Sequence, residues 1–551
     1  MQRSRVRRVG SLLVGLTLIA AACGDDDETP STGGDDTTVT TPTTTGGGAT
    51  TPSTGGGATT PSTGGDTTPS TGGDTTPSTG GDTTPSTGGD TTPSTGGDTT
   101  PSTGGSVPPS GIGQCSGEIA IPETDATTAP TEAPAPGATT PATEAGGEPG
   151  ALAGMKGTTP LVDLPEDFVA RLNTCWTDLG NAELADLNYG AESYDAVIVI
   201  ALAAEIAQTD GSAAAAEIVG VTRDGEKCTD FAGCMALVQE GTDIDYDGAS
   251  GPMEFNGNGE PLVASYGVLT FGEDNRIDDA VTEYVTAESP AEAEVPLSEV
   301  EADREGDGTL KFGTILPETG SLAFLGPPEF AGVELAIADV NAAGGVLGND
   351  VEVEQGDSGD TSTDTASQTV DRLIAADADA IIGAASSGVT LTVIDKITQA
   401  GVIQFSPANT SEELSDYDDS GLYFRNAPPD SLQGPTVANL VVDDGNASAY
   451  ILALDDAYGT GLAASTEATL TEAGVEVLDT VIYDPLAASF DSEVQAIADA
   501  DPDAIVLITF DEGSRILRAM DEIGIGPTAK AVYGVDGNMG NALGENFEGG
   551  T

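Results

Sequence analysis

The chain has 551 residues, enough for two or three domains of ordinary size. It carries 91 Asp and Glu against 17 Lys and Arg, which makes a net charge of −74, and it contains no histidine. This charge argues against nucleic acid as a partner, because binding to phosphates needs a basic surface. Without an imidazole group the chain cannot build a histidine-dependent serine triad or a zinc-protease motif.

The first 22 residues are typical of an export signal peptide. Several arginines precede the apolar run Leu12–Ala22, which is too short to span a membrane comfortably. The stretch Ile19–Cys23 resembles a bacterial lipoprotein box, so we expect cleavage before Cys23 and a lipid on its thiol. Such an anchor holds a protein on the extracytoplasmic face of the cell membrane. A plain secretory signal with an incidental cysteine is the alternative, and Arg7-Arg8 also fits a weak twin-arginine signal.

Residues 23–149 are predicted to form a low-complexity stalk. Between Thr50 and Ser106, the unit Thr-Thr-Pro-Ser-Thr-Gly-Gly-Asp or a near copy occurs seven times. The unit has no large apolar side chain, so it cannot bury a core. A flexible coil of this length has an r.m.s. reach of roughly 60 Å. We therefore expect a disordered, solvated spacer between the membrane and a folded module.

From Met155 onward the composition is that of a folded protein, and after Leu310 short β-branched runs alternate with helical patterns. Strands are predicted at 310–316, 351–355, 380–383, 402–405, 448–454, 475–483, 504–510 and 529–534. Helices are predicted at 328–343, 363–376, 389–399, 461–473, 490–498 and 513–523. Strands that alternate with crossover helices predict an α/β fold with doubly wound parallel sheets, here in two series. Ligands of such sheets bind outside the carboxyl ends of the strands.

Five motifs in this region resemble the extracytoplasmic branched-chain amino-acid-binding proteins of ABC transporters. They are Phe312–Gly320, Asn341–Gly345, Gly383–Ser387, Ser406–Thr410 and Asp456–Gly459. The resemblance covers residues 308–551. It implies the type I periplasmic-binding fold, in which two Rossmann-like lobes, joined at a hinge by three crossing strands, close on a ligand in the cleft between them.

The elements that such proteins carry after this region resemble segments that occur earlier in this chain. The segments are 152–158 for the crossing strand, 188–196 for the start of the next helix, and 250–255 and 264–271 for the last strands. We therefore expect a circular permutation, in which residues 150–285 supply the C-terminal portion of the fold, 286–307 a linker, and 308–551 the N-terminal portion. A broken or mispredicted gene from a tandem array is the alternative.

Candidate ligand contacts in the first lobe follow two neighbouring strands. Ser386 and Ser387 come after one strand and just before a helix that begins near Gly388. Their hydroxyls, the loop N–H groups and the helix N-terminus predict a site for a ligand carboxylate. Ala408 and Thr410 follow the next strand and are expected to add backbone and hydroxyl contacts. Ordinary N-capping serines and a simple turn are the alternatives.

The second lobe has to supply an acceptor for the ammonium group of an amino acid. Asp536 follows the strand that ends near Gly534 and resembles the acidic residue of the family at that place, although a plain Asp-Gly turn is the alternative. Asp511 and Tyr458 lie at comparable strand ends, with Tyr458 as a lid, and Leu325 is expected to flank the mouth of the cleft. Aromatic side chains are otherwise more often part of a core.

One acidic stretch has the pattern of a calcium-binding loop. Asp243, Asp245, Asp247 and Glu254 stand at the first, third, fifth and twelfth positions of that pattern. We favour a solvated acidic loop, because Ser250 replaces the usual apolar eighth residue and a strand, not a helix, is predicted to follow. No metal or other cofactor is therefore expected.

Four cysteines remain after lipidation, and outside the membrane they are expected to be oxidised. Cys228 and Cys234 close a short loop and are predicted to pair. This leaves Cys115 and Cys175, whose pairing follows by elimination from three possible arrangements.

The resemblance implies a lipid-anchored solute-binding protein that delivers a small amino acid or similar solute to an ABC import permease. A sensory or surface receptor that uses the same fold without transport is the alternative. No enzyme is expected, because the usual catalytic constellations are absent and Gly383–Gly388 lacks the Gly-x-Ser-x-Gly spacing of a nucleophile elbow.

Overall fold

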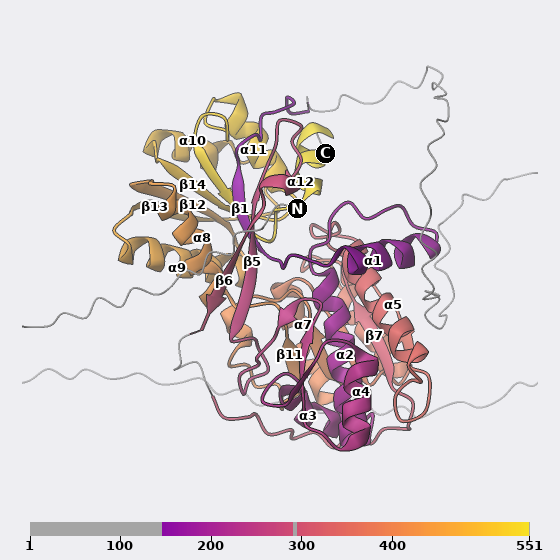
Figure 1. Cartoon of the computed structure of the whole chain (residues 1–551). Coiled ribbons are helices and arrows are strands. Elements are labelled where there is room, and N and C mark those ends of the chain that lie inside the picture. The colour runs from indigo at the N-terminus through magenta and orange to yellow at the C-terminus, as the bar shows by residue number, and fades with distance from the viewer. Residues whose placement is uncertain (1–145, 290–294, 550–551) are drawn as a thin grey trace, which may run out of the picture. The chain divides into compact units, whose positions relative to one another are not determined.

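A computed structural model describes residues 146–289 and 295–549 (Figure 1). The predicted signal peptide, nearly all of the stalk, Cys23 and Cys115 lie outside the described residues. Two large β-sheets with their helices make up the described part of the chain. Within it, no single helix is long and apolar enough to cross a bilayer, and one bent pair, 190–207 with 212–221, meets that test by length and composition only.

The first lobe is built on a five-stranded sheet in which all neighbouring strands are parallel. In spatial order its strands are β11 (Tyr423–Arg425), β10 (Ile403–Ser406), β9 (Ala380–Gly383), β7 (Lys311–Ile315) and β8 (Glu352–Glu354). Its helices are α1 (Glu166–Asp178), α2 (Gly190–Ala207), α5 (Gly326–Ala342), α6 (Thr365–Ala375) and α7 (Ser387–Gln399). Fifteen of the 18 residues of α2 are buried, so this helix forms part of the core rather than a surface.

A small three-stranded sheet belongs to the same lobe. It comprises β2 (Glu226–Cys228), β3 (Ile244–Gly248) and β4 (Gly251–Pro252), with α3 (Ala215–Val221) and α4 (Phe231–Glu240) packed on α2. Short 3₁₀ turns are found at Ser212–Ala214, Asp279–Val281 and Glu412–Leu414.

The second lobe is built on a seven-stranded mixed sheet. In spatial order its strands are β13 (Glu476–Tyr483), β12 (Ser448–Leu454), β14 (Ala504–Ile508), β15 (Ala531–Gly534), β1 (Lys156–Pro160), β5 (Val263–Thr270) and β6 (Glu283–Glu288). The first five are parallel, whereas β5 and β6 are antiparallel to their neighbours. Its helices are α8 (Asp430–Asp443), α9 (Ala457–Glu472), α10 (Asp491–Ala500), α11 (Gly513–Glu522) and α12 (Asn541–Gly549). The central strand β14 is an unbroken buried apolar run, as a covered parallel strand requires.

Residues 150–285 and 308–551 contribute to both lobes. In the second lobe β1 pairs with β15 in parallel, with Lys156 opposite Tyr533. In the first lobe α2 packs against α5 so closely that a Cβ on Gly332 would stand 2.1 Å from the backbone oxygen of Gly190. Neither block therefore buries its own apolar surface without the other.

The strands and helices predicted between residues 310 and 534 are all present, with ends shifted by a few residues. Neither α8 nor β11 was predicted from the sequence. The helix α8 carries an internal Pro435 and little amphipathic pattern, and β11 is only three residues long. The strand expected at 250–255 is reduced to the two residues of β4.

The described part of the predicted linker, residues 295–307, lies along the first lobe. Its backbone donates from Ser298 to Gly257 and from Glu301 to Ser420. Arg304 forms an ion pair with the buried Asp379 at 2.5 Å. The start of the predicted linker instead belongs to β6, which extends to Glu288.

Candidate ligand-binding site

A small cavity lies between the carboxyl ends of strands from the two lobes. It is lined by Tyr189, Leu322, Leu325, Ala385, Ser386, Ser387, Ala408, Thr410, Tyr458, Phe510, Asp536 and Gly537. Its volume is about 20 Å³, enough for one or two water molecules. Seven of the eight predicted ligand-contact residues meet at this cavity, which follows the rule that parallel sheets bind ligands at their strand ends.

The serines of the first lobe stand at the N-terminus of α7. Ser386 is the N-cap residue, and its Oγ accepts a hydrogen bond from Val389 N at 3.3 Å. The Oγ of the buried Ser387 accepts one from Ser411 N, also at 3.3 Å. Ser386 is thus an N-capping serine, as the alternative interpretation held, and it also lines the cavity. The positive end of the α7 dipole points toward this wall.

The adjacent loop after β10 supplies a free hydroxyl. Thr410 is 1% exposed, and its Oγ1 has no hydrogen-bond partner of ordinary geometry, although it lies near enough to Asp430 to lower the pKa of that carboxyl group. Buried hydroxyls usually have a hydrogen-bond partner, so the Thr410 hydroxyl is available to donate to a ligand that enters the cavity. Asn409 fixes the loop, because its Nδ2 donates to the backbone oxygens of Ala384 and Ala385 at 3.0 and 2.8 Å.

The wall of the second lobe centres on the Asp536 carboxylate, which is 5% exposed. Tyr189 donates to its Oδ2 at 2.7 Å and Tyr458 to its Oδ1 at 2.6 Å. The amide of the fully buried Gln433 also donates to Oδ1. Three neutral donors therefore orient a carboxylate that has no cationic partner among the described residues.

Burial makes it costly for the two carboxyl groups at this wall to carry a negative charge. It raises the pKa of Asp536 above its ordinary value, although the hydrogen bonds from the tyrosines and Gln433 oppose the rise. Asp430 lies close by, fully buried and with both carboxylate oxygens unpartnered. Burial, and then the neighbouring Asp536, raise the pKa of Asp430 well above its usual range. A ligand cation beside Asp536 would relieve this strain.

Apolar side chains complete the cavity. Leu325 is the N-cap residue of α5 and is buried, and Leu322 lies one turn earlier. The ring of Tyr458 stacks on Phe510, with centroids 5.5 Å apart and an interplanar angle of 11°. The lining of the cavity therefore combines hydroxyls at a helix N-terminus, one carboxylate and several apolar side chains.

Asp511 is the predicted contact residue that does not line the cavity. It is exposed, and the preceding Phe510 takes the position at the wall. Tyr189 and Gln433, which come from the α2 N-terminus and from α8, were not predicted as site residues. No local pattern marks either residue, because each reaches Asp536 only through the tertiary fold.

The two lobes touch at the rim of the cavity. Ser411 Oγ donates to the backbone oxygen of Ala457 at 3.0 Å. A Cβ on Gly388 would stand 3.5 Å from Asp456 Oδ2. A ligand the size of an amino acid therefore enters only after these contacts open.

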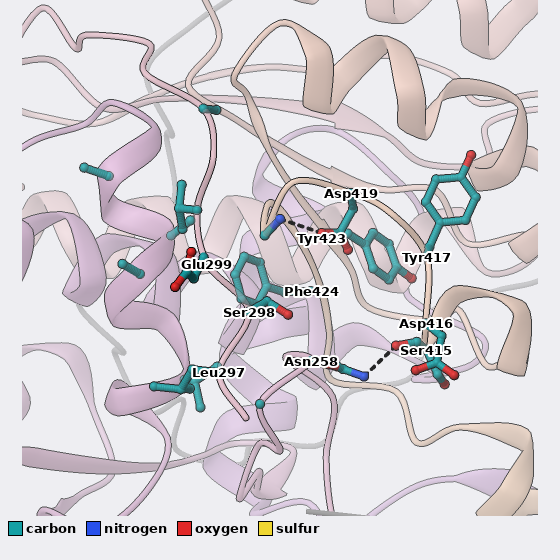
Figure 2. Close-up of a pocket in the computed structure, with 18 residues that line it drawn as sticks. Asn258, Leu297, Ser298, Glu299, Ser415, Asp416, Tyr417, Asp419, Tyr423 and Phe424 are labelled. Atoms are coloured by element: carbon teal, nitrogen blue, oxygen red, sulfur yellow. Dashed lines mark hydrogen bonds between the residues drawn. The ribbon is translucent and has the colours of Figure 1, made fainter. Parts of the chain in front are cut away.

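A second, larger cavity of about 700 Å³ lies in the first lobe, beside residues 297–302 (Figure 2). Asn258 Nδ2 donates to the backbone oxygen of Ser415 at 2.7 Å within its wall. None of its lining side chains has a buried polar atom without a partner, and none is a predicted contact residue. The interlobe cavity, with the free Thr410 hydroxyl, is the better candidate for a ligand site.

The acidic stretch with the calcium-loop pattern surrounds a lysine. Lys227 Nζ lies 2.9 Å from Asp245, 3.0 Å from Asp247 and 3.5 Å from Glu254. The stretch forms β3 and β4 rather than an open loop. An ammonium group thus holds three of the four carboxylates that the pattern assigns to calcium, the fourth being that of Asp243.

The cysteines follow the predicted pairing where the structure describes it. Cys228 and Cys234 form a disulfide, which confirms that prediction. Cys175 is also disulfide-bonded. Its partner lies outside the described residues, so the pairing of Cys175 with Cys115 stays a prediction.

Part of this chain matches a family model and several curated proteins in sequence. Residues 309–551 match a family model described as periplasmic binding protein. Leu/Ile/Val-binding protein homolog 8 of Brucella abortus (strain 2308) is 28% identical over 230 residues, which cover 40% of this chain and 57% of that protein. An amino acid binding protein of Pseudomonas aeruginosa is 31% identical over 176 residues, covering 32% of this chain and 46% of that protein. The chain thus spans about half the length of the curated relatives it matches.

Partial matches among solved structures include solute-binding proteins that were crystallised with different ligands. The branched-chain amino acid transporter substrate binding protein LivJ of Streptococcus pneumoniae, in complex with isoleucine, has 27% identity and a TM-score of 0.39, covering 43% of this chain and 67% of that chain. A solute binding protein of an ABC transporter from Rhodopseudomonas palustris BisB5, in complex with 3,4-dihydroxybenzoic acid, has 22% identity and a TM-score of 0.36, covering 41% and 62%. Residues 309–551 therefore resemble the periplasmic binding proteins in sequence, and the described part of the chain is a mixed α/β structure with mostly parallel sheets.

Proposed function

We propose that this chain is an extracytoplasmic solute-binding protein that captures a small amino acid of the branched-chain type, or a similar solute, between its lobes and delivers it to an ABC import permease. The observation that carries the proposal is the opposition of charges across the interlobe cavity. The α7 N-terminus, Ser387 and the free Thr410 hydroxyl suit a carboxylate, and the buried Asp536 suits an ammonium group.

The apolar part of the cavity favours a hydrocarbon side chain. Leu322, Leu325 and the stacked pair Tyr458–Phe510 offer no charge to a ligand at this surface. A polar side chain there would lose its hydration without gaining a partner, which costs about 1–3 kcal/mol. The same cavity disfavours an aromatic acid without an amino group, because such a ligand leaves the Asp536 charge unpaired.

Screening of purified protein tests the proposal. Thermal melts with leucine, isoleucine, valine, glutamate, asparagine, urea and 4-hydroxybenzoate should show the largest stabilisation with the three aliphatic amino acids. Preference for 4-hydroxybenzoate, or no stabilisation by any amino acid, would contradict it.

We also propose that Cys23 carries the lipid that anchors the protein to the extracytoplasmic face of the membrane. The support is the sequence alone: the arginine-led apolar run and the small residues before Cys23. The protein should fractionate with membranes, and Cys23→Ala should release it into the soluble fraction. Membrane association that persists in the variant would contradict the anchor.

We propose, third, that residues 150–285 and 308–551 form one circularly permuted module. The pairing of β1 with β15 and the ion pair between Arg425 and Glu260 at 2.5 Å support it. If a protease site is inserted in the linker 286–307 and cut, the two fragments should stay together in gel filtration and keep ligand affinity. Fragments that separate under native conditions would contradict a shared fold.

A further inference from the structure

A cavity of about 100 Å³ lies where the chain crosses between the two lobes. The end of β1, the segment before β5 and the segment between β11 and α8 all contribute to its wall, through Pro160, Pro261 and Pro428. It shares no lining residue with the interlobe cavity. We call it the hinge cavity, because any change in lobe angle has to bend these crossings.

Oxygen acceptors dominate the polar lining of the hinge cavity. Glu192, in the first turn of α2, is 7% exposed. Asn426 is also 7% exposed; its Nδ2 donates to the backbone oxygen of Glu192 at 2.8 Å, and its Oδ1 has no hydrogen-bond partner. Ser250, Ser265 and Thr286 line the same space. The Asn426 side chain is thus oriented with its Nδ2 hydrogen-bonded and its Oδ1 available as an acceptor.

A second carboxyl group lies close to Glu192. Glu329, in the first turn of α5, is fully buried, and both of its carboxylate oxygens are unpartnered. Burial, and then the neighbouring Glu192, raise its pKa well above the usual range. Among the described residues, no Lys or Arg contributes to the pKa shift of either carboxyl group. Asp195, which also raises the pKa of Glu192, already accepts hydrogen bonds from Tyr246 and Ser250.

Buried carboxylates without a positive partner cost several kcal/mol each, so a cation or a proton has to compensate them. A cavity of this volume has room for an ion together with one or more water molecules. Its donors are one carboxylate and neutral oxygens, which are hard ligands. Calcium usually takes six to eight oxygens with several carboxylates, and the described residues contain no cluster of three or more His, Cys, Asp or Glu that would hold a metal ion.

We propose that the hinge cavity binds a partly hydrated monovalent cation, sodium or potassium, through the carboxylate of Glu192 and Oδ1 of Asn426. The bound ion ties α2 to the chain crossing between β11 and α8 and so favours one lobe angle. This inference concerns the fold of the full chain and does not depend on which solute enters the interlobe cavity.

Thermal unfolding of the full chain at constant ionic strength tests the site. Melts in NaCl or KCl are compared with melts in N-methyl-D-glucamine chloride at pH 8.5, without amino acid. A cation at ten times its Kd multiplies the folding equilibrium constant about elevenfold, which raises Tm by about 2–3 °C for a domain of this size. Glu192→Gln should abolish the difference between the salts. Glu240→Gln, an exposed change of equal charge on α4, should keep it.

Glu192→Gln is isosteric and removes a buried charge, so the variant should be at least as stable as the parent in N-methyl-D-glucamine. A second measurement is the broadening of the ²³Na resonance by the protein, which added KCl should reverse in the parent and in Glu240→Gln but which Glu192→Gln should lack. Equal Tm in all three salts, a sodium effect that survives Glu192→Gln, or stabilisation by CaCl₂ alone would overturn the proposal.

Discussion

The substitution Asp536→Asn separates the charge at the interlobe cavity from its shape. The carboxylate accepts hydrogen bonds from Tyr189 at 2.7 Å, from Tyr458 at 2.6 Å and from Gln433. Asparagine keeps one acceptor for Tyr458 and Gln433, and the Tyr189 hydroxyl, which both donates and accepts, turns to accept from the new amide. The variant also avoids burying a charge, so its Tm in the absence of ligand should change by less than about 3 °C.

Ligand affinity should respond much more strongly than stability. A hydrogen bond to a charged group contributes about 1.5–3 kcal/mol, so the loss of the carboxylate should weaken leucine binding about 10- to 150-fold. Isothermal titration calorimetry on the full chain measures this change. The exposed Asp511→Asn, which makes the same chemical change next to Phe510 but outside the cavity, should leave the leucine Kd within about twofold. Equal affinities of Asp536→Asn and the parent protein would refute the assigned role of Asp536.

Three further predictions concern other groups. Thr410→Val removes a buried, unpartnered hydroxyl, so Tm should hold or rise while leucine affinity falls about tenfold or more; a Tm loss with unchanged affinity would show a structural role instead. Replacing Cys228 and Cys234 together by serine opens a disulfide loop with a sequence separation of 6, which should lower the free energy of unfolding in urea by about 2 kcal/mol, and no change would contradict the pairing. Burial raises the pKa of Glu192 from 4.5 to about 8, so at low concentrations of alkali cations stability should fall as pH rises through this window; Glu192→Gln should flatten that part of the Tm–pH curve, and an unchanged slope would assign it to other groups.

The sheets and most of the site followed from patterns that act over short distances. Apolar runs such as β14, and the loops after β9 and β10, can be predicted from the sequence. Because ligands of parallel sheets bind at the carboxyl ends of the strands, Ser387 and Thr410 are then placed at one edge of the sheet. The same rule did not decide which of two neighbours faces the cavity. At the end of β14 the wall residue is Phe510, and the side chain of Asp511 is exposed.

The rest of the site depends on contacts between distant parts of the chain. Tyr189 reaches Asp536 across 347 positions, and Gln433 reaches it from a helix whose pattern the sequence analysis missed. The calcium-loop pattern likewise matched the residue types and their spacing. It did not predict the lysine that pairs with these carboxylates, because Lys227 comes from the neighbouring strand β2. Residue pattern alone does not report which charge the fold places next to a carboxylate.

The central claim is that the interlobe cavity recognises both ends of an α-amino acid. Calorimetric titration of the full chain with leucine, leucinamide and 4-methylpentanoate tests it most directly, because the two analogues lack the carboxylate and the ammonium group in turn. We predict that each analogue binds at least about tenfold more weakly than leucine, and that Asp536→Asn weakens leucine binding but not that of 4-methylpentanoate. Binding of 4-methylpentanoate as tight as that of leucine would contradict the claim.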